Sequence, residues 1–119
     1  MSNRPDCTYA RHILLSETKK IYKELFGKGP ENVRLRISGD VVVIELSCFL
    51  RAAEIQLIRQ QPQKARLVKA YRQAILESMK EEVLQRVESV LGCKVIRYLY
   101  EIDVLANSAI TMFILDKPL

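Results

Sequence analysis

Residues 33–46 read VRLRISGDVVVIEL, and this stretch decides the fold class. From Val33 to Ser38, apolar and polar residues alternate, which is the period-two pattern of a half-buried β-strand. Gly39-Asp40 is a two-residue turn with glycine first, which predicts a tight hairpin. The return strand, Val41 to Leu46, is apolar on both faces. We therefore expect it to lie in the centre of a sheet or beneath a partner.

Helices are predicted on both sides of this hairpin. Before it, the spacing of apolar residues predicts a helix from Thr8 to Phe26, which Gly27 ends. After it, we expect a short helix from Ala52 to Gln60 and one long helix from Lys64 to Leu91. Residues three or four apart give the long helix a continuous apolar stripe of Val68, Tyr71, Ile75, Met79, Val83, Val87 and Leu91. The stripe spans about 40 Å, longer than a small sheet covers, so its excess predicts contact with other helices or a second copy.

A second hairpin closes the chain. Lys94 to Val104 and Ala109 to Leu115 are predicted as strands, and the first should present one uniformly apolar face made of Ile96, Tyr98, Tyr100, Ile102 and Val104. The element order is then α-β-β-α-α-β-β. Two hairpins separated by helices most simply give an α+β fold, a four-stranded antiparallel sheet with helices packed on one face. We interpret residues 1–119 as a single domain of this kind.

Composition excludes several classes of site. The lone histidine, His12, and three scattered cysteines do not match a zinc pattern or a disulfide framework, so we expect no metal and no cofactor. Gly27-Lys28-Gly29 closes a helix rather than following a strand, so it is not a phosphate loop. No nucleophile or carboxylate stands beside His12, and we predict no catalytic residue. Met1 to Asp6 is polar and lacks the apolar core of a signal peptide, which predicts a cytoplasmic protein without membrane insertion.

Charge gives two further candidates for function. The chain has 19 basic and 14 acidic residues, and the excess favours acidic partners. Arg59, Lys64, Arg66 and Lys69 belong to a basic cluster from Arg51 to Arg72, which is a candidate contact for an anion or an acidic partner. A nucleic-acid-binding module using this cluster is the alternative interpretation, although few aromatic residues accompany it for base stacking.

Asp103 stands among apolar neighbours on a predicted strand. Such a carboxylate serves a ligand site, caps a turn or pairs with an arginine, and Arg72 and Arg97 are available as partners. We expect a polar layer over the sheet. An enzyme or small-ligand site at Asp103 and Arg72 is a third hypothesis, which requires one pocket that holds both groups.

A resemblance adds to this interpretation. Gly27-Lys28-Gly29-Pro30, then Gly39-Asp40 before three valines, resembles the MpsC-like family of small bacterial proteins, and the likeness covers nearly the whole chain. It continues through Leu50, Glu54, Arg72, Gly92, Val95, Asp103, Phe113 and Leu115. At Arg51 the chain departs from the family's Leu-Thr-x-x-Glu pattern, in which threonine caps the short helix.

The resemblance implies a function without naming catalytic residues. The family takes its name from a cytoplasmic component of a cation-translocating, membrane-potential-generating system. Together with the residues, this implies a non-enzymatic accessory or regulatory protein that acts by protein–protein interaction. Glu54, Arg72 and Asp103 are its candidate partner or polar-layer residues. We expect a homodimer that assembles with a membrane transport complex and is peripheral to the membrane through that partner.

Overall fold

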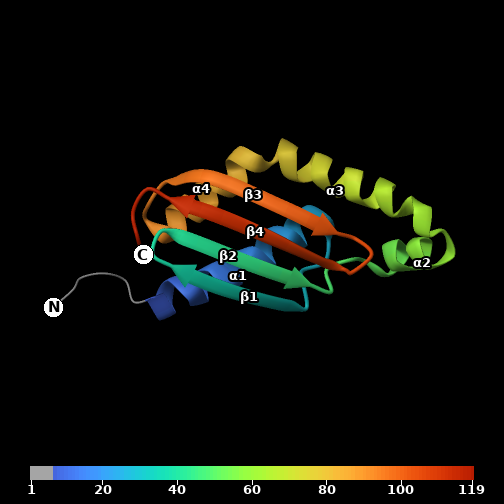
Figure 1. Ribbon diagram of the computed structural model, residues 1–119, viewed down its shortest axis with the longest axis horizontal. Coiled ribbons are helices and arrows are strands. Elements are labelled where there is room, and N and C mark those ends of the chain that lie inside the picture. The colour runs from blue at the N-terminus through green and yellow to red at the C-terminus, as the bar shows by residue number, and fades with distance from the viewer. Residues whose placement is uncertain (1–6) are drawn as a thin grey trace.

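A computed structural model describes residues 7–119; the predicted polar start, Met1 to Asp6, and the side chain of Cys7 lie outside the described residues. The elements follow one another as α1 (Cys7–Phe26), β1 (Asn32–Ser38), β2 (Val41–Ser47), α2 (Ala52–Gln60), a 3₁₀ turn η1 (Pro62–Lys64), α3 (Ala65–Ser78), α4 (Lys80–Leu91), β3 (Val95–Asp103) and β4 (Ser108–Leu115). Figure 1 shows this arrangement. The predicted α+β class and element order are confirmed.

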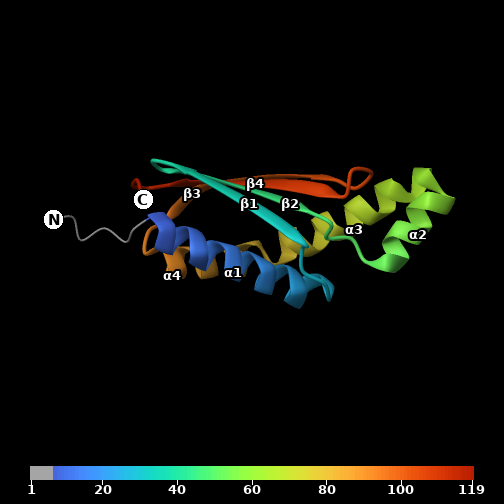
Figure 2. The ribbon, with the colours of Figure 1, turned by 90° about the horizontal axis from the view of Figure 1, so that it is seen from below.

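The strands of residues 7–119 form a four-stranded antiparallel sheet in the order β1-β2-β4-β3. β2 pairs with β1 on one side and with β4 on the other, so the doubly apolar strand is central, as expected. Figure 2 shows α1 and α4 on one side of the sheet, beneath the strands in this view, and α2 beyond one end of the sheet. The first and last strands in the sheet order, β1 and β3, are edge strands.

Cross-strand register assigns each residue to a face. The core face is buried under the helices and carries Leu35, Val42, Ile44, Leu46, Ile102, Ala109, Phe113 and Leu115. Within residues 7–119, no helix covers the other side, which we call the open face (Figure 2). Its middle is nevertheless apolar, with Val41, Val43, Leu99, Ile110, Met112 and Ile114.

The helix layer is tied together by one arginine. Arg86 on α4 donates from Nε to Glu17 of α1 at 2.7 Å and also pairs with Glu24, about two helical turns further along α1. The hydrogen bond to Glu24, with those to Glu17, raises the pKa of Arg86 above its ordinary value. These pairs hold α1 and α4 side by side under the sheet.

The predicted long helix from Lys64 to Leu91 is wrong as a single element. It is divided into η1, α3 and α4, with the break at Met79, where φ is −105° and ψ is 7°. The Oγ of Ser78 donates to the carbonyl of Ile75 at 2.9 Å. Serine hydroxyls that compete for a backbone carbonyl often bend helices, and the break follows directly after this contact.

The predicted apolar face of β3 is also wrong at one residue. The β3–β4 register shifts between Val95 and Arg97, and Ile96 is exposed to 62% rather than aligned with Tyr98 and Tyr100. A bulge inserts one extra residue and reverses the face of the residues before it. Period-two counting from Ile96 therefore fails at this position.

Residues 51–72, which we call the arm, extend past one end of the sheet (Figures 1 and 2). The molecule measures 57 × 24 × 21 Å, and the arm supplies much of its length. None of residues 52–60 in α2 is buried. α2 therefore packs against the core only through half-buried side chains such as Ile55, Leu57 and Ile58, and the fully buried contacts of the arm lie at its root.

Gly92 gives a first prediction. It ends α4 with φ +70°, and a Cβ added there would have no heavy atom within 4 Å. Gly92→Ala should therefore destabilise the fold by about 1 kcal/mol through backbone strain alone. Urea denaturation measures this, with Gly92→Asn as the control, because asparagine tolerates the left-handed conformation better and should have a smaller effect. Equal losses for both variants would contradict this explanation.

Candidate partner-binding site at the root of the arm

A buried arginine anchors the arm. Arg72 on α3 is 1% exposed, because the spacing from Val68 through Arg72 to Leu76 places all three on the buried side of the helix. Its guanidinium carbon lies 4.3 Å from the centre of the Phe26 ring and 5.1 Å from that of Phe49. Both distances suit a cation–π contact. The charge is therefore held between two aromatic rings from α1 and from the segment after β2.

Glu54 neutralises this charge. Nε of Arg72 donates to Oε2 of Glu54 at 2.9 Å, and Nη2 donates to Oε1 at 2.6 Å, so the pair is bidentate. Nη2 also lies 3.4 Å from the Phe49 carbonyl, while Nη1 is buried without a hydrogen-bond acceptor among residues 7–119. A bidentate ion pair fixes orientation as well as charge, so α2 and α3 are locked together at this point.

Glu54 has a second role at the start of α2. Its Oε1 accepts the backbone N–H of Arg51, the N-cap residue, at 2.7 Å. The side chain of Arg51 has only donors and cannot replace a capping threonine. Burial by itself would raise the pKa of Glu54, but the hydrogen bonds from Arg72 and from the Arg51 backbone, with both guanidinium charges, outweigh it. The pKa of Glu54 therefore lies below its ordinary value.

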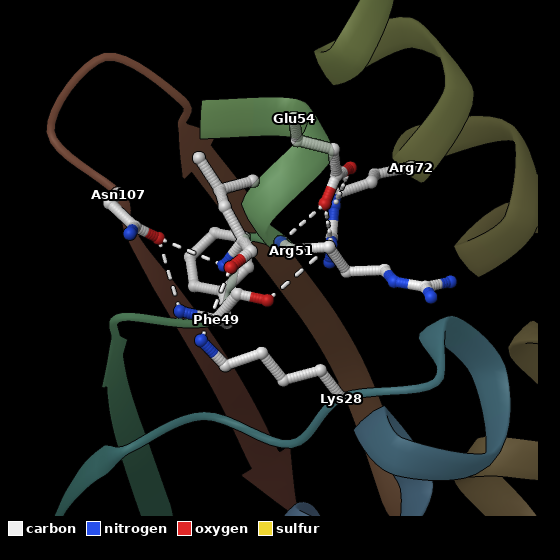
Figure 3. A network of polar contacts seen from close by, with 7 residues as sticks. Lys28, Phe49, Arg51, Glu54, Arg72 and Asn107 are labelled. Carbon is white, nitrogen blue, oxygen red and sulfur yellow. Dashed lines mark hydrogen bonds and ion pairs between the residues drawn. The ribbon is translucent and has the colours of Figure 1, made fainter. Parts of the chain in front are cut away.

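The same root is joined to the sheet by Asn107. Its Oδ1 accepts the N–H groups of Phe49 and Leu50, both at 3.1 Å, and its carbonyl accepts the N–H of Cys48. Lys28, which follows α1, donates to the Leu50 carbonyl at 3.2 Å. Figure 3 shows these contacts converging on the Phe49 segment from three sides. The β3–β4 turn, the end of α1 and the arm therefore meet at one polar network.

Tyr22 packs against both aromatic rings that contact Arg72. Its ring centre lies 5.5 Å from that of Phe26 and 6.0 Å from that of Phe49. Burial raises the pKa of Tyr22 to about 12, although the charge of Arg72 acts in the opposite direction. The phenol therefore stays neutral at physiological pH, and Glu54 remains the negative partner of Arg72.

A groove of about 590 Å³ opens beside this network. Its walls come from α2, α3 and the end of α1, and they include Phe26, Leu57, Leu67, Val68 and Tyr71. Leu67 and Tyr71 are each 59% exposed at its edge. Adjacent exposed apolar side chains in a concavity are typical of a binding surface for apolar groups of a partner.

The net charge of the protein is concentrated in the arm. Residues 51–72 contain six basic residues and one acidic residue, whereas the rest of the chain contains 13 of each. The arm thus accounts for the whole net charge of +5. An apolar groove in a basic arm suits a partner segment that carries both apolar and acidic side chains.

The structure brings two of the predicted residues together and separates the third. Glu54 and Arg72 form the central ion pair. Asp103 is exposed at the end of β3, where its Oδ1 accepts the N–H of Ala106 at 3.1 Å and stabilises the β3–β4 turn. Asp103 lines hollows at the sheet edge, not the groove with Arg72. The third hypothesis required one pocket for both groups, and the groove that Arg72 lines does not hold Asp103.

The predicted basic contacts lie outside the groove. Arg59 is exposed on α2 and Lys64 is half-buried in η1. Arg66 and Lys69 line a separate hollow of about 350 Å³ beside β3. Lys69 pairs with Glu101 at 2.6 Å, and the hydrogen bond from Lys69 lowers the pKa of Glu101. These four residues are therefore spread over the surface of the arm instead of forming one site.

Metal-ligating side chains do not gather in the described part of the chain. Residues 7–119 contain no group of three or more histidine, cysteine, aspartate or glutamate side chains placed to hold a metal ion. Cys93 is buried and Cys48 is half-buried. No helix among residues 7–119 has the length and apolar character needed to cross a membrane.

Sequence reasoning missed several residues of the site. The apolar spacing predicts Tyr71 in the buried stripe, but Arg72 takes that place and Tyr71 faces out. The sequence carries only a weak signal for the burial of Arg72, since a charged side chain is ordinarily expected to face solvent. The turn at Asn107 could have been predicted, because asparagine is common at turn positions that need a left-handed backbone, and its φ here is 51°.

Comparison with known proteins identifies the family. The model of the family described as "Na+-translocating membrane potential-generating system (MpsC)" matches residues 10–117. The chain belongs to the MpsC family. A relative, the uncharacterized protein YrhF of Bacillus subtilis (strain 168), is 28% identical over 102 residues, which cover 85% of this chain and 83% of the relative. No solved structure matches the chain.

The departure of this MpsC chain at Arg51 has a structural counterpart. Glu54 still accepts the backbone N–H of Arg51, so this part of the cap is retained without the threonine. The Arg51 guanidinium instead packs on Gly27, where an added Cβ would lie 3.2 Å from Nη1. In this MpsC protein, Arg51 thus joins the start of the arm to the end of α1.

Proposed function

We propose that this protein is a non-enzymatic accessory subunit of a cation-translocating membrane system. In this proposal it acts from the cytoplasm and binds a cytoplasmic segment of that system in the groove of the arm. The observation that carries the proposal is the apolar groove within a region that holds the whole net charge. Family membership supplies the kind of system.

The polar groups at the groove support a binding role over a catalytic one. Both carboxylate oxygens of Glu54 accept hydrogen bonds from Arg72, and one also accepts that of Arg51. Arg72 is sandwiched between two rings and is 1% exposed. A general acid or base must reach a substrate proton, whereas these groups are used to hold the arm in place.

Leu67 and Tyr71 provide the test. Replacing both with serine should reduce binding to inside-out vesicles that contain the cation-translocating system by at least about tenfold, because exposed aromatic and apolar anchors dominate such interfaces. The free energy of unfolding should change by less than about 1 kcal/mol, since both side chains are mostly exposed. Co-sedimentation with the vesicles measures the binding.

The matched control is Leu105→Ser, which removes an apolar side chain that is 69% exposed on the β3–β4 turn and outside the groove. It should bind like the parent. Equal binding by the groove variant, or by vesicles from a strain lacking the system, would overturn the proposal. Equal binding to protein-free anionic vesicles would assign the arm to lipid instead.

Nucleic-acid binding is tested with the same protein. This alternative predicts that DNA retains the protein at low salt, that the retention falls steeply as salt rises, and that replacing Arg66 and Lys69 with glutamate abolishes it. Lys69 already pairs with Glu101, and the aromatic residue of the arm, Tyr71, lies at the groove. We therefore expect no sequence-independent retention at physiological salt.

A further inference from the structure

The open face carries an ordered pattern of charge and apolar residues. One row of side chains in cross-strand register crosses the four strands and consists of Arg36, Val43, Met112 and Leu99. The next row toward the arm is Arg34, Glu45, Ile110 and Glu101. These two rows are basic at the β1 edge and acidic or apolar at the β3 edge, whereas the row farther from the arm, Ser38, Val41, Ile114 and Arg97, is basic at the β3 edge.

The middle of this face is unusually apolar for a solvated surface. Ile110 is 41% exposed and Leu99 is 58% exposed, and Val43 and Met112 lie between them on the paired strands. An antiparallel sheet with one solvated face normally presents polar side chains there. A contiguous apolar centre with a charged border is instead typical of an interface.

We propose that two copies of this chain pack open face to open face about a twofold axis parallel to the strands. This axis places the β1 edge of one copy over the β3 edge of its partner. Arg34 then lies over the partner's Glu101, and the contact occurs twice. The apolar rows stack on themselves, with Val43 over the partner's Met112.

Charge selects this arrangement over the other twofold one. The alternative axis also lies in the plane between the two sheets but runs across the strands. It would place β1 over the partner's β1, so that the basic side chains of the two β1 edges would lie beside one another. Like charges in an interface disfavour association. Glu101 already pairs with Lys69 at 2.6 Å, but its side chain is 66% exposed and a carboxylate can accept from a second cation, so it can also meet the partner's Arg34.

The size of the face suits a small dimer. Four strands about 4.8 Å apart and four side-chain rows about 6.8 Å apart cover roughly 500 Å² of sheet plane per copy. Accessible area exceeds the plane area, since side chains make the surface uneven. Specific interfaces bury about 800 Å² per partner. The dimer should therefore form at micromolar concentration and leave the groove of the arm exposed.

Charge complementation provides the experiment. The 119-residue chain should sediment as a dimer at equilibrium. Arg34→Glu places a carboxylate over the partner's Glu101, and Glu101→Arg places a guanidinium over the partner's Arg34. Each variant alone should therefore dimerise at least about tenfold more weakly, because like charges then meet. A mixture of the two variants should form heterodimers, since one of its two contacts joins the new carboxylate to the new guanidinium and the other keeps the original pair.

Controls separate this surface from the others. Glu81→Arg, an exposed reversal on α4, and the Leu67→Ser, Tyr71→Ser variant should both remain dimeric, and circular dichroism should show all variants folded. A parent protein that is monomeric at every concentration would overturn the proposal. So would a dimer that resists both single reversals, or single variants that stay monomeric when mixed. These outcomes do not depend on whether the groove binds the membrane system.

Discussion

Glu54→Ala is expected to reduce the free energy of unfolding by about 3–5 kcal/mol. The substitution leaves the guanidinium of Arg72 buried without its counter-charge, which is far more costly than losing an exposed ion pair. It also removes the acceptor for the Arg51 N–H at the start of α2. Chemical denaturation measures the loss, and Glu54→Gln, which keeps an acceptor for the Arg51 N–H, separates the charge from the cap.

Two controls make this prediction specific. Glu31→Gln removes an exposed pair with Lys28 and should change stability by less than about 0.5 kcal/mol. Glu54→Leu combined with Arg72→Met replaces the buried pair by apolar groups between the two rings, and should recover most of the loss. If the double variant is as unstable as Glu54→Ala, the cost does not come from an unpaired buried charge.

Acid should weaken the same pair. The pKa of Glu54 in the folded protein lies below its ordinary value of 4.5, which represents the unfolded chain. The contribution of Glu54 to stability is therefore complete above that value and is lost as the pH falls through the lower, folded pKa. Denaturation at a series of pH values should show a smaller acid loss for Glu54→Gln than for the parent. Identical slopes would contradict this assignment.

Asn107→Ala should have the second largest effect, about 2–4 kcal/mol. Its Oδ1 accepts the N–H groups of Phe49 and Leu50, and both donors would lose their partner. Alanine would also have to adopt the φ of 51° that asparagine tolerates. Urea denaturation gives the total, and hydrogen exchange at the Phe49 and Leu50 amides should accelerate more than exchange in the centre of β2.

Other substitutions of Asn107 separate the loss of the hydrogen bonds from the backbone strain. Asn107→Asp retains an acceptor and the tolerance of the left-handed conformation, so it should cost less than about 1 kcal/mol. Asn107→Gly relieves the strain but lacks the acceptor, so it should fall between the other two. A glycine variant as stable as the parent would show that the hydrogen bonds contribute little.

Local signals were enough to predict the sheet and most element bounds. Gly39-Asp40 and the alternation before it fix a hairpin and its register, because a slip of one residue would expose the apolar side. The break at Met79 was not predicted, because the apolar spacing continues through it and the competing contact of Ser78 depends on local geometry. The bulge at Ile96 was missed for a similar reason.

The candidate site was predictable only in part. Glu54 and Arg72 were selected, but sequence spacing could not show that they pair with each other and not with Asp103. Their contact depends on how α2 and α3 fold back on one another, which is a tertiary property. Burial of Arg72 depends on Phe26 and Phe49, which are 46 and 23 positions away in the chain. No local pattern encodes such an arrangement.

The position of the arm makes the molecule an electric dipole along its 57 Å axis. Five net positive charges lie at one end, and the remaining residues are neutral overall. Near an acidic surface, the field exerts a torque that turns the arm forward. At physiological ionic strength this torque acts within about one Debye length, roughly 8 Å, of contact. The protein is therefore oriented in the final step of its approach, with the arm and its groove turned toward the acidic surface.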